Sequence, residues 1–315
     1  MKNQDERLHR IRLVTWNIEK GKRWELLEKC LKTEAIGTAD ILCLNEVDEG
    51  MARSGNRRIA FEIGERLGMQ VAFGQTYKEL TKGLGEERFA PGENTTALQG
   101  NATLSRFPIQ QSKNLCLPAC HDPSKSQEKR KGGRHALIVT LDSGGGKSLT
   151  VANTHLEVFA TTQCRNRQMK FLLQHIGAGP AVVTGDFNTN TFDRGSALAT
   201  IKSVIQLLGS DVNLRVMRPY QHEPLFEELQ KAGFSWKEFN DAAATCSVDL
   251  SSLEDRKYIP AQIRNHIVNR YGLLPLRLDF FACRGLEALS PGRTITELPS
   301  QPSDHLPITC DVWLA

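Results

Sequence analysis

The sequence predicts an α/β protein in which short strands and helices alternate along the whole chain. Two observations lead to this prediction. Nine short runs rich in β-branched and aromatic residues recur from one end of the sequence to the other, which makes strands the dominant element. Amphipathic segments lie between these runs, and several of them end at a glycine, as the C-terminus of a helix commonly does.

The predicted strands are apolar runs bounded by polar or turn-forming residues. They cover residues 11–18, 40–47, 70–76, 101–109, 135–142, 148–157, 181–188, 276–285 and 306–314. The predicted helices cover residues 22–38, 56–69, 164–178, 195–209 and 223–233. Because no repeat, low-complexity tract or Pro/Gly/Ser linker divides the chain, we expect one domain over residues 1–315, with an insertion around residues 205–272.

The composition is that of an ordinary globular protein with a small excess of positive charge. Hydrophobic residues make up 40% of the chain and charged residues 24%, which argues against global disorder. The net charge of +4 permits an anionic substrate without arguing for one. The first residues contain no uninterrupted apolar run, so we expect neither a signal peptide nor a membrane span, and a cytoplasmic location.

The eight cysteines lie mostly inside apolar runs and form no C-x-x-C pair. We therefore expect reduced, largely buried thiols. Cys116 and Cys120 are the closest pair in sequence, but no cluster of Cys or His completes a zinc site around them.

The run AVVTGDFNTN carries the clearest chemical motif. It is an apolar strand that ends in Asp186 and Asn188, whose side chains leave the strand on the same side. Asp186 could accept a proton from water while Asn188 orients that water or a phosphate oxygen. A strand followed by an Asx turn explains the same four residues equally well.

Two further strands end in residues that suit a magnesium ion. DILCLNEVD places Glu46, a hard oxygen ligand, near the end of an apolar run, and VTWNIEKG supplies the neutral oxygen of Asn17. The alternatives are an exposed strand end for Glu46 and a turn former for Asn17.

The remaining motifs pair carboxylates with histidines. LRLDFFACRG embeds Asp279 in an apolar run, where a carboxylate is costly unless it is paired, and His305 of PSDHLPITC is a suitable partner. Asp304 precedes His305, and NTHLE places His155 late in its own strand. A helix cap explains Asp304 and a hydrogen-bonded core histidine explains His155 if each is taken alone.

Taken in order, TWN, LNEV, THLE, GDFN, RLDFF and SDHLP resemble the motifs of the endonuclease/exonuclease/phosphatase family, over residues 15–307. The resemblance implies a four-layer α/β sandwich with two central, mainly antiparallel sheets flanked by helices. The family includes abasic-site endonucleases, secreted DNases, deadenylases, tyrosyl-DNA phosphodiesterases, neutral sphingomyelinases and inositol-polyphosphate phosphatases.

The resemblance also implies a division of roles among the site residues. Glu46, helped by Asn17, would ligate Mg²⁺ or Mn²⁺, and Asp304 would support the metal region. Asp186 and Asn188 would position and deprotonate the attacking water, although the sequence does not decide which residue is the general base.

In the same scheme the histidines act on the substrate phosphate. Asp279 would orient His305, which with His155 would contact the scissile phosphate and share proton transfer. Asn101 in GNATLSRFPI matches a family position near the phosphate less tightly. Arg134 in KGGRHALIV is a further phosphate-binding candidate because arginine binds phosphate in a bidentate manner, but a solvated hairpin residue explains it as well.

The branch of the family is less clearly indicated. Abasic-site endonucleases usually carry a Tyr-x-Pro-Asn type segment where this chain has NTHLE, so His155 favours the histidine-containing branches. We expect a metal-dependent phosphodiester hydrolase, first a nuclease, with hydrolysis of phospholipids or small phosphoesters as the alternative. An inactive binding module of the same fold is the second alternative, although the intact motifs argue against it. No protein partner follows from the sequence.

Three other segments have competing interpretations. The basic loop with Lys125, Lys129, Arg130, Lys131 and Arg134 could track a nucleic-acid backbone, but a solvated loop is the more common structure. The aromatic residues of segment 223–241 could form a stacking wall, but an amphipathic helix packed on the core is favoured. GGGKS at 144–148 lacks the first glycine of a P-loop, so we expect a hairpin turn there.

Overall fold

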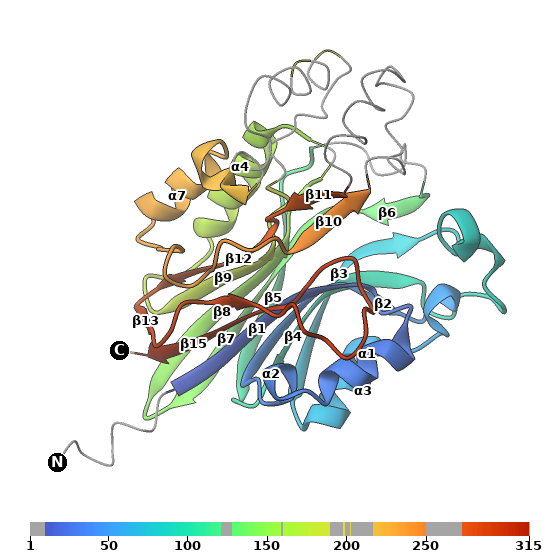
Figure 1. The fold of residues 1–315 in the computed structure, drawn as a ribbon, viewed down its shortest axis with the longest axis horizontal. Helices are drawn as coiled ribbons and strands as arrows, with labels where there is room; N and C mark the ends of the chain where they lie inside the picture. The colour runs from blue at the N-terminus through green and yellow to red at the C-terminus, as the bar shows by residue number, and fades with distance from the viewer. Residues whose placement is uncertain are drawn as a thin grey trace.

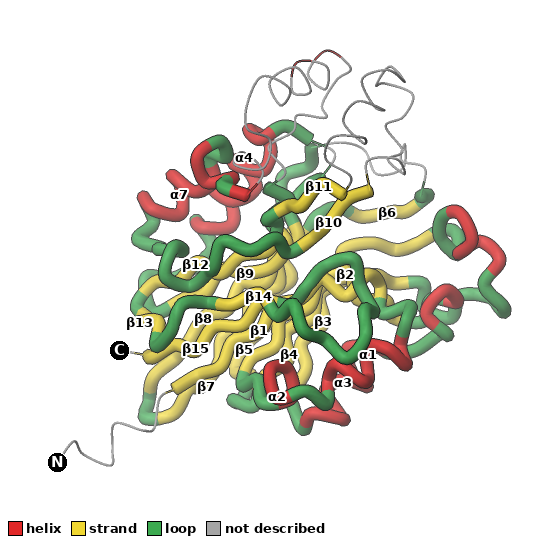
Figure 2. Tube along the Cα trace, in the orientation of Figure 1, coloured by secondary structure: helices red, strands yellow, loops and turns green. Residues whose placement is uncertain are grey.

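The structure is a computed structural model that describes residues 10–120, 128–158, 160–189, 217–249 and 273–314, together with residues 198 and 202. Strands run through the centre of the molecule, and helices lie on its two outer sides (Figure 1). Figure 2 shows the same arrangement, with the strands in yellow between two groups of helices in red. Among the described residues, no helix is long and apolar enough to cross a membrane.

The first sheet has eight strands, in the order β13-β15-β1-β2-β4-β3-β6, with β14 also paired to β15. Its strands are β1 (Arg10–Lys20), β2 (Ile41–Glu49), β3 (Gln70–Glu79), β4 (Leu98–Ser105), β6 (Arg130–Gly132), β13 (Leu286–Ala288), β14 (Arg293–Thr294) and β15 (Ile308–Leu314). β1 and β2 are parallel, and the other pairs are antiparallel. β1 and β15, from opposite ends of the sequence, are therefore direct neighbours.

The second sheet has five strands, in the order β12-β9-β8-β7-β5. Its strands are β5 (Ile109–Cys116), β7 (His135–Gly144), β8 (Lys147–His155), β9 (Ala181–Asp186) and β12 (Asp279–Arg284). Only β8 and β9 are parallel. β10 (Cys246–Asp249) and β11 (Leu273–Leu276) form a separate antiparallel pair.

Helices cover the outer face of each sheet. They are α1 (Trp24–Leu31), α2 (Glu34–Gly37), α3 (Ile59–Leu67), α4 (Thr162–Leu173) and α7 (Leu225–Lys231), with short 3-10 helices η2 (Ala52–Ser54), η3 (Gly85–Phe89) and η5 (Pro219–Gln221). Trp24 of α1 packs in one core cluster with Trp16 of β1. Met169 of α4 packs in another with Val183 of β9.

The core between the two sheets completes four layers. Leu13 of β1 and Val151 of β8 belong to this inner cluster, whereas Ala152, the next residue of β8, packs with the outer helices. Successive strand residues point to opposite faces, so each central strand is buried on both sides. The predicted four-layer sandwich with two mainly antiparallel sheets is confirmed.

All nine predicted strands are present, as are four of the five predicted helices. The fifth, 195–209, lies almost entirely outside the described residues, as does most of the expected insertion at 205–272. β5 was not predicted, because this edge strand exposes most of its residues and has no apolar alternation. The GGGKS turn joins β7 to β8 as a hairpin, with positive φ at Gly145 and Gly146.

The expectation that every cysteine is reduced is wrong. Cys120, in the loop after β5, forms a disulfide with Cys164 of α4, and their Cα atoms lie 6.0 Å apart. The pairing was not visible in the sequence because 44 positions separate the two residues. Five of the six free cysteines are buried, as expected, and Cys116 is exposed.

Candidate active site

Three neighbouring strands of the second sheet place acidic and imidazole groups at one edge. Asp186, the last residue of β9, lies opposite His155, the last residue of β8, and opposite Asp279, the first residue of β12. Residues that are opposite one another in a sheet have their side chains on the same face. The pairing register therefore gathers these three groups although up to 124 positions separate them in the sequence.

Asp186 is the centre of this group. Asn17 of β1 donates a hydrogen bond from Nδ2 to Asp186 Oδ2 at 3.1 Å. The same Oδ2 atom lies 3.4 Å from His155 Nε2 and 3.8 Å from His305 Nε2. The backbone N–H of Asn188 donates to the other oxygen, Oδ1, at 2.9 Å. Both carboxylate oxygens of Asp186 are therefore oriented by neighbouring groups.

His305 is held from several directions just before β15. Its Nδ1 lies 2.8 Å from Asp279 Oδ2, which is the pairing that the sequence predicts. Trp16 donates from Nε1 to the carbonyl oxygen of His305 at 2.9 Å, and the backbone N–H of His305 donates to Ser303 Oγ at 3.0 Å. These contacts fix both the backbone and the ring of His305.

Burial and neighbouring charges shift the pKa values of Asp186, His155 and His305 in different directions. Burial, reinforced by the charge of Asp279, raises the pKa of Asp186 to about 7, against opposing interactions with His305 and Asn17. Burial, together with the positive charge of Arg134, holds the pKa of His155 well below its ordinary value. Burial alone would lower the pKa of His305. The interactions of His305 with Cys246 and Asp279 outweigh this effect and raise its pKa well above the ordinary value.

Buried asparagines support the site from beneath. Asn45 of β2 accepts a hydrogen bond on Oδ1 from the backbone N–H of Asp186 at 2.9 Å. Its Nδ2 donates to Asn101 Oδ1 and to Asn153 Oδ1, each at 2.9 Å. Asn153 in turn donates to the carbonyl oxygens of Leu44 and Ala102. This asparagine network, Asn45, Asn101 and Asn153, joins the two sheets directly below Asp186.

Sequence reasoning missed Asn45 and Asn153. The available signal was a polar residue inside each apolar run, immediately before Glu46 and two residues before His155. Asn101, predicted near the substrate phosphate, is 1% exposed and donates from Nδ2 to the carbonyl oxygen of His135 at 3.0 Å. Both ends of its side-chain amide are therefore engaged within the protein.

Glu46 lies in a distortion of β2. The register between β2 and β4 shifts between Leu44 and Val47, and Glu46 has a φ of 52°, a left-handed conformation that costs energy for a residue other than glycine. Such bulges redirect a side chain out of the regular alternation. Glu46 is half-buried, and its charge helps to raise the pKa of Arg134 against the opposing effect of burial.

Arg134 is not a solvated hairpin residue. It is 7% exposed, its guanidinium lies 5.7 Å from the ring centre of Tyr77, and its Nε lies 3.5 Å from Glu157 Oε2. Arg130 is also buried, and its guanidinium lies 3.8 Å from the Tyr77 ring centre. The solvated-loop interpretation is therefore wrong for these two arginines. Lys129 and Lys131 are exposed, and Lys125 lies outside the described residues.

The aromatic residues after α4 do not form a stacking wall. Phe226 and Trp236 belong to the core cluster that α4 and α7 form with the second sheet, and their ring centres lie 5.1 Å apart. Phe234 and Phe239 are buried as well. The packed amphipathic helix is the correct interpretation of this segment.

The polar groups at this edge fit a divalent cation. One ligand atom each from Asp186, Asp279 and His305 lie within 4.8 Å of one another. Oδ1 of Asp279 is buried and has no hydrogen-bond partner among the described residues. Carboxylate and amide oxygens are the donors that Mg²⁺ and Mn²⁺ prefer. The metal ligands that the sequence predicts are three other residues: Asn17 touches Asp186, Glu46 follows Asn45 on β2, and Asp304 is exposed beside His305.

Comparison with known proteins identifies related sequences and folds. Residues 14–305 match the sequence model described as the Endonuclease/Exonuclease/phosphatase family. No curated protein matches the chain. An endonuclease/exonuclease/phosphatase from Beutenbergia cavernae DSM 12333 is 18% identical with a TM-score of 0.59, and the match covers 98% of this chain and 72% of that one.

Two further structures are similar over nearly their whole length. The human Nocturnin catalytic domain, solved with a bound sulfate anion, is 21% identical with a TM-score of 0.54, and the match covers 98% of this chain and 94% of that one. The 3′ phosphatase NExo from Neisseria, solved with a product DNA hairpin, is 16% identical with a TM-score of 0.52, over 95% of this chain and 98% of that one. At these identities the similarity shows the fold.

Proposed function

The chain belongs to the endonuclease/exonuclease/phosphatase family, and from this premise we propose that it is a nuclease that cleaves phosphodiester bonds with the aid of Mg²⁺ or Mn²⁺. One observation carries the proposal. Asp186 Oδ2 lies within 3.8 Å of both His155 Nε2 and His305 Nε2, and Asn17 donates a hydrogen bond to it. A carboxylate, two imidazoles and an amide at one point can act as the base, the acid and the orienting donor for in-line attack of water on a phosphate.

In the proposed mechanism Asp186 is the general base. It accepts a proton from a water molecule that Asn188 helps to orient, and the oxygen of that water forms a bond to phosphorus as the bond to the leaving oxygen breaks. His305, fixed by Asp279 at 2.8 Å, faces the reacting phosphate together with His155 and donates a proton toward the leaving oxygen. Arg134 neutralises charge on a phosphoryl oxygen.

A divalent ion would be held by Glu46, Asn17 and Asp304 at the same edge. Its chemical contribution would be Lewis-acid stabilisation of the charge that develops on the phosphoryl oxygens. Two acidic groups, Asp186 and Asp279, lie close together in a buried region, and a cation there would reduce their mutual repulsion.

Nucleic acid as the substrate is supported by a basic cavity next to the end of β3 and the start of β6. The cavity has a volume of about 400 Å³ and is lined by Thr81, Lys82, Gly83, Arg88 and Lys129. β6, which carries Arg130, pairs with the end of β3 and so connects the region of Arg134 with this cavity. Cationic side chains at Arg134 and again in the cavity suit a polymer with repeated phosphates.

Phospholipid hydrolysis is the second candidate, favoured by one observation. The loop between β3 and β4 that carries the basic cavity also exposes Leu80, which is 52% exposed, and Phe89, which is 85% exposed. Exposed apolar side chains beside cations would suit an anionic lipid surface.

The proposal includes one catalytic domain over residues 1–315, located in the cytoplasm. Disulfides are rare in reducing compartments, so the Cys120–Cys164 bond makes the location a point to test. Non-reducing electrophoresis of protein taken directly from cells, with alkylation at lysis, measures whether the bond is present there. A fully oxidised chain would contradict the cytoplasmic location.

The first experiment is hydrolysis of bis-p-nitrophenyl phosphate with Mg²⁺, with Mn²⁺ and with a chelator. We expect activity that requires the metal and falls at least 100-fold in Asp186→Asn. If folded wild type and variant were equally inert, the chain would be a binding module. A panel of single-stranded DNA, duplex DNA, RNA, sphingomyelin and phosphoinositides then identifies the substrate, and turnover of the lipids alone would overturn the nuclease proposal.

A further inference from the structure

The mechanism leaves one polar group beside His305 without a role, the thiol of Cys246. We propose that Cys246, His305 and Asp304 form a second metal-binding site, which shares His305 and Asp304 with the proposed hydrolytic centre, for a thiophilic divalent ion such as Zn²⁺, and that an ion bound there inhibits the enzyme. The binding part stands on geometry alone, whereas the inhibition part rests on the proposed hydrolytic function.

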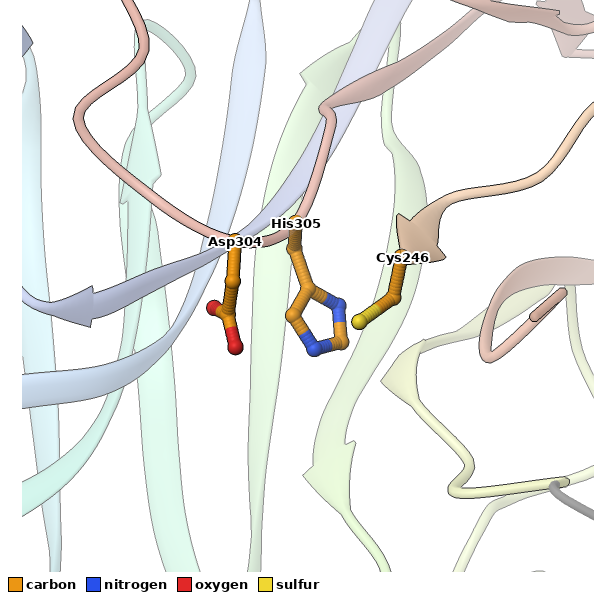
Figure 3. A group of neighbouring side chains, drawn as sticks. All are labelled: Cys246, Asp304 and His305. Atoms are coloured by element: carbon orange, nitrogen blue, oxygen red, sulfur yellow. The ribbon is translucent and has the colours of Figure 1, made fainter. Parts of the chain in front are cut away.

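The fold brings the three side chains together from two segments. Cys246 begins β10, and its backbone forms an isolated bridge with that of His305, while the N–H of Leu306 donates to the carbonyl oxygen of Thr245 at 2.7 Å. The imidazole of His305 lies between the thiol on one side and the Asp304 carboxylate on the other (Figure 3). The three ligand atoms lie within 4.8 Å of one another.

The donor set suits zinc better than magnesium. One sulfur, one imidazole nitrogen and one carboxylate oxygen are ligands that Zn²⁺ accepts in tetrahedral geometry, whereas Mg²⁺ prefers oxygen alone. Zinc bond lengths place tetrahedral ligand atoms about 3.3–3.8 Å apart, so small side-chain rotations bring the present atoms into range. Three protein ligands leave the fourth position to water.

Access and charge balance are also compatible with binding. Asp304 is exposed, whereas Cys246 and His305 are 5% and 6% exposed, so an ion can meet the carboxylate first and then reach the buried donors. On binding, the thiol of Cys246 and the protonated imidazole of His305 each form a bond to the metal, and each releases a proton to solvent. The resulting thiolate and the carboxylate together balance the charge of the divalent ion.

Occupation of this site is incompatible with the hydrolytic arrangement of His305. If the ion takes Nδ1, it displaces Asp279, whose oxygen is now 2.8 Å from that nitrogen. If it takes Nε2, it occupies the nitrogen that faces Asp186 at 3.8 Å. Metal on Nε2 replaces the proton that His305 would donate to a substrate, and metal on Nδ1 removes the contact with Asp279 that orients the ring.

Binding is tested on the full chain with cobalt as a spectroscopic probe of the zinc site. Co²⁺ added to metal-free wild-type protein should produce the near-ultraviolet charge-transfer absorption of a cobalt–thiolate bond, and Zn²⁺ should abolish it. The absorption should be lost in Cys246→Ser and retained in Cys116→Ser, a control that removes the exposed cysteine. Absorption that persists in Cys246→Ser would overturn the proposal.

A second measurement does not depend on the folding of a variant. X-ray absorption of wild-type protein loaded with Zn²⁺ should show a sulfur scatterer at about 2.3 Å, and a shell of nitrogen and oxygen alone would overturn the site. Asp304→Asn, a change at an exposed residue, should weaken zinc binding at least tenfold. Unchanged affinity in that variant would remove Asp304 from the ligand set that we propose.

Inhibition is measured separately, in excess Mg²⁺. Zn²⁺ should reduce hydrolysis of bis-p-nitrophenyl phosphate by wild type, and a zinc-selective chelator should restore it. In Cys246→Ser, half-inhibition relative to the zinc-free rate of that variant should require at least tenfold more Zn²⁺. Zinc bound through sulfur without inhibition would refute the inhibitory role. A wild-type protein inactive under every condition would instead refute the proposed function, and the spectra would still decide the metal site.

Discussion

The side-chain amide of Asn45 donates a hydrogen bond to Asn153 Oδ1 at 2.9 Å, and this bond connects β2 of one sheet with β8 of the other. Both residues are fully buried. Asn45 also accepts the backbone N–H of Asp186, so the same side chain that joins the sheets holds the end of β9. The position of Asp186 therefore depends on how the two sheets are fixed relative to each other.

Replacing Asn45 should destabilise the protein strongly. Asn45→Ala leaves buried partners on Asp186, Asn101 and Asn153 without their hydrogen bonds, so we expect the free energy of unfolding to fall by about 3 kcal/mol. Urea unfolding measures the loss. Asn114→Ala, which removes one exposed hydrogen bond from β5 to the carbonyl oxygen of Gln75 on β3, is the matched control and should cost below about 1 kcal/mol. Equal losses in the two variants would contradict a special role for the network.

Replacing Asp279 should affect catalysis more than folding. Asp279→Asn keeps the shape of the side chain but removes the charge that holds and polarises His305, so we expect kcat to fall at least 100-fold. Circular dichroism and kinetics on bis-p-nitrophenyl phosphate separate the two effects. Asp311→Asn, which breaks ion pairs with Arg10 and Arg12 away from the site, should keep kcat within about twofold of wild type. A similar kcat in both variants would argue against the role of Asp279.

Glu87 should make stability depend on acid pH. Burial alone would raise its pKa, but the charges of Lys20, Arg53 and Lys22 lower it to about 2 from an ordinary value of 4.5. Because the folded pKa is the lower one, the stabilisation is present above pH 4.5 and is lost as the pH falls toward 2. We expect Glu87→Gln to be less stable by about 1 kcal/mol near neutral pH, allowing for partial exposure.

The measurement is the difference in unfolding free energy between wild type and Glu87→Gln as a function of pH. The difference should shrink across the interval from 4.5 to about 2. Glu86→Gln, at the exposed neighbouring position, is the control and should differ little from wild type at any pH. A difference for Glu87→Gln that stays constant down to acid pH would refute the assignment.

The disulfide should contribute measurably to stability. Joining residues 44 positions apart restricts the unfolded chain, and chain-entropy estimates for a loop of this length reach about 4 kcal/mol. The double variant Cys120→Ser, Cys164→Ser should therefore lose about 2–4 kcal/mol of unfolding free energy. Reducing agent should lower the stability of wild type but not of the double variant. Insensitivity of wild type to complete reduction would contradict this expectation.

The central strands and the pairing of Asp279 with His305 could be predicted from the sequence. The strands are long apolar runs, and a carboxylate inside such a run requires a partner. The edge strand β5 could not be predicted, because its exposed residues lack apolar alternation. The burial of Arg130 and Arg134 against Tyr77 depends on the pairing of β3 with β6, which no local pattern specifies.

The close packing of strands beneath the site is indicated in the sequence by a single residue, Gly185. Gly185 has a φ of 118°, and a Cβ atom at this position would lie 2.1 Å from the carbonyl oxygen of Thr154 and 2.8 Å from Asn45 Oδ1. The glycine of GDFN is therefore required by a close approach of neighbouring strands. The approach becomes visible only when the register of β8 and β9 is known.

The pairing of β1 with β15 has a consequence for synthesis of the protein on the ribosome. Asn17 of β1 is translated 288 residues before His305, which lies just before β15. A nascent chain that has exposed Glu46, His155 and Asp186 still lacks His305. The group of side chains that the proposed mechanism uses is therefore complete only after His305 has been translated.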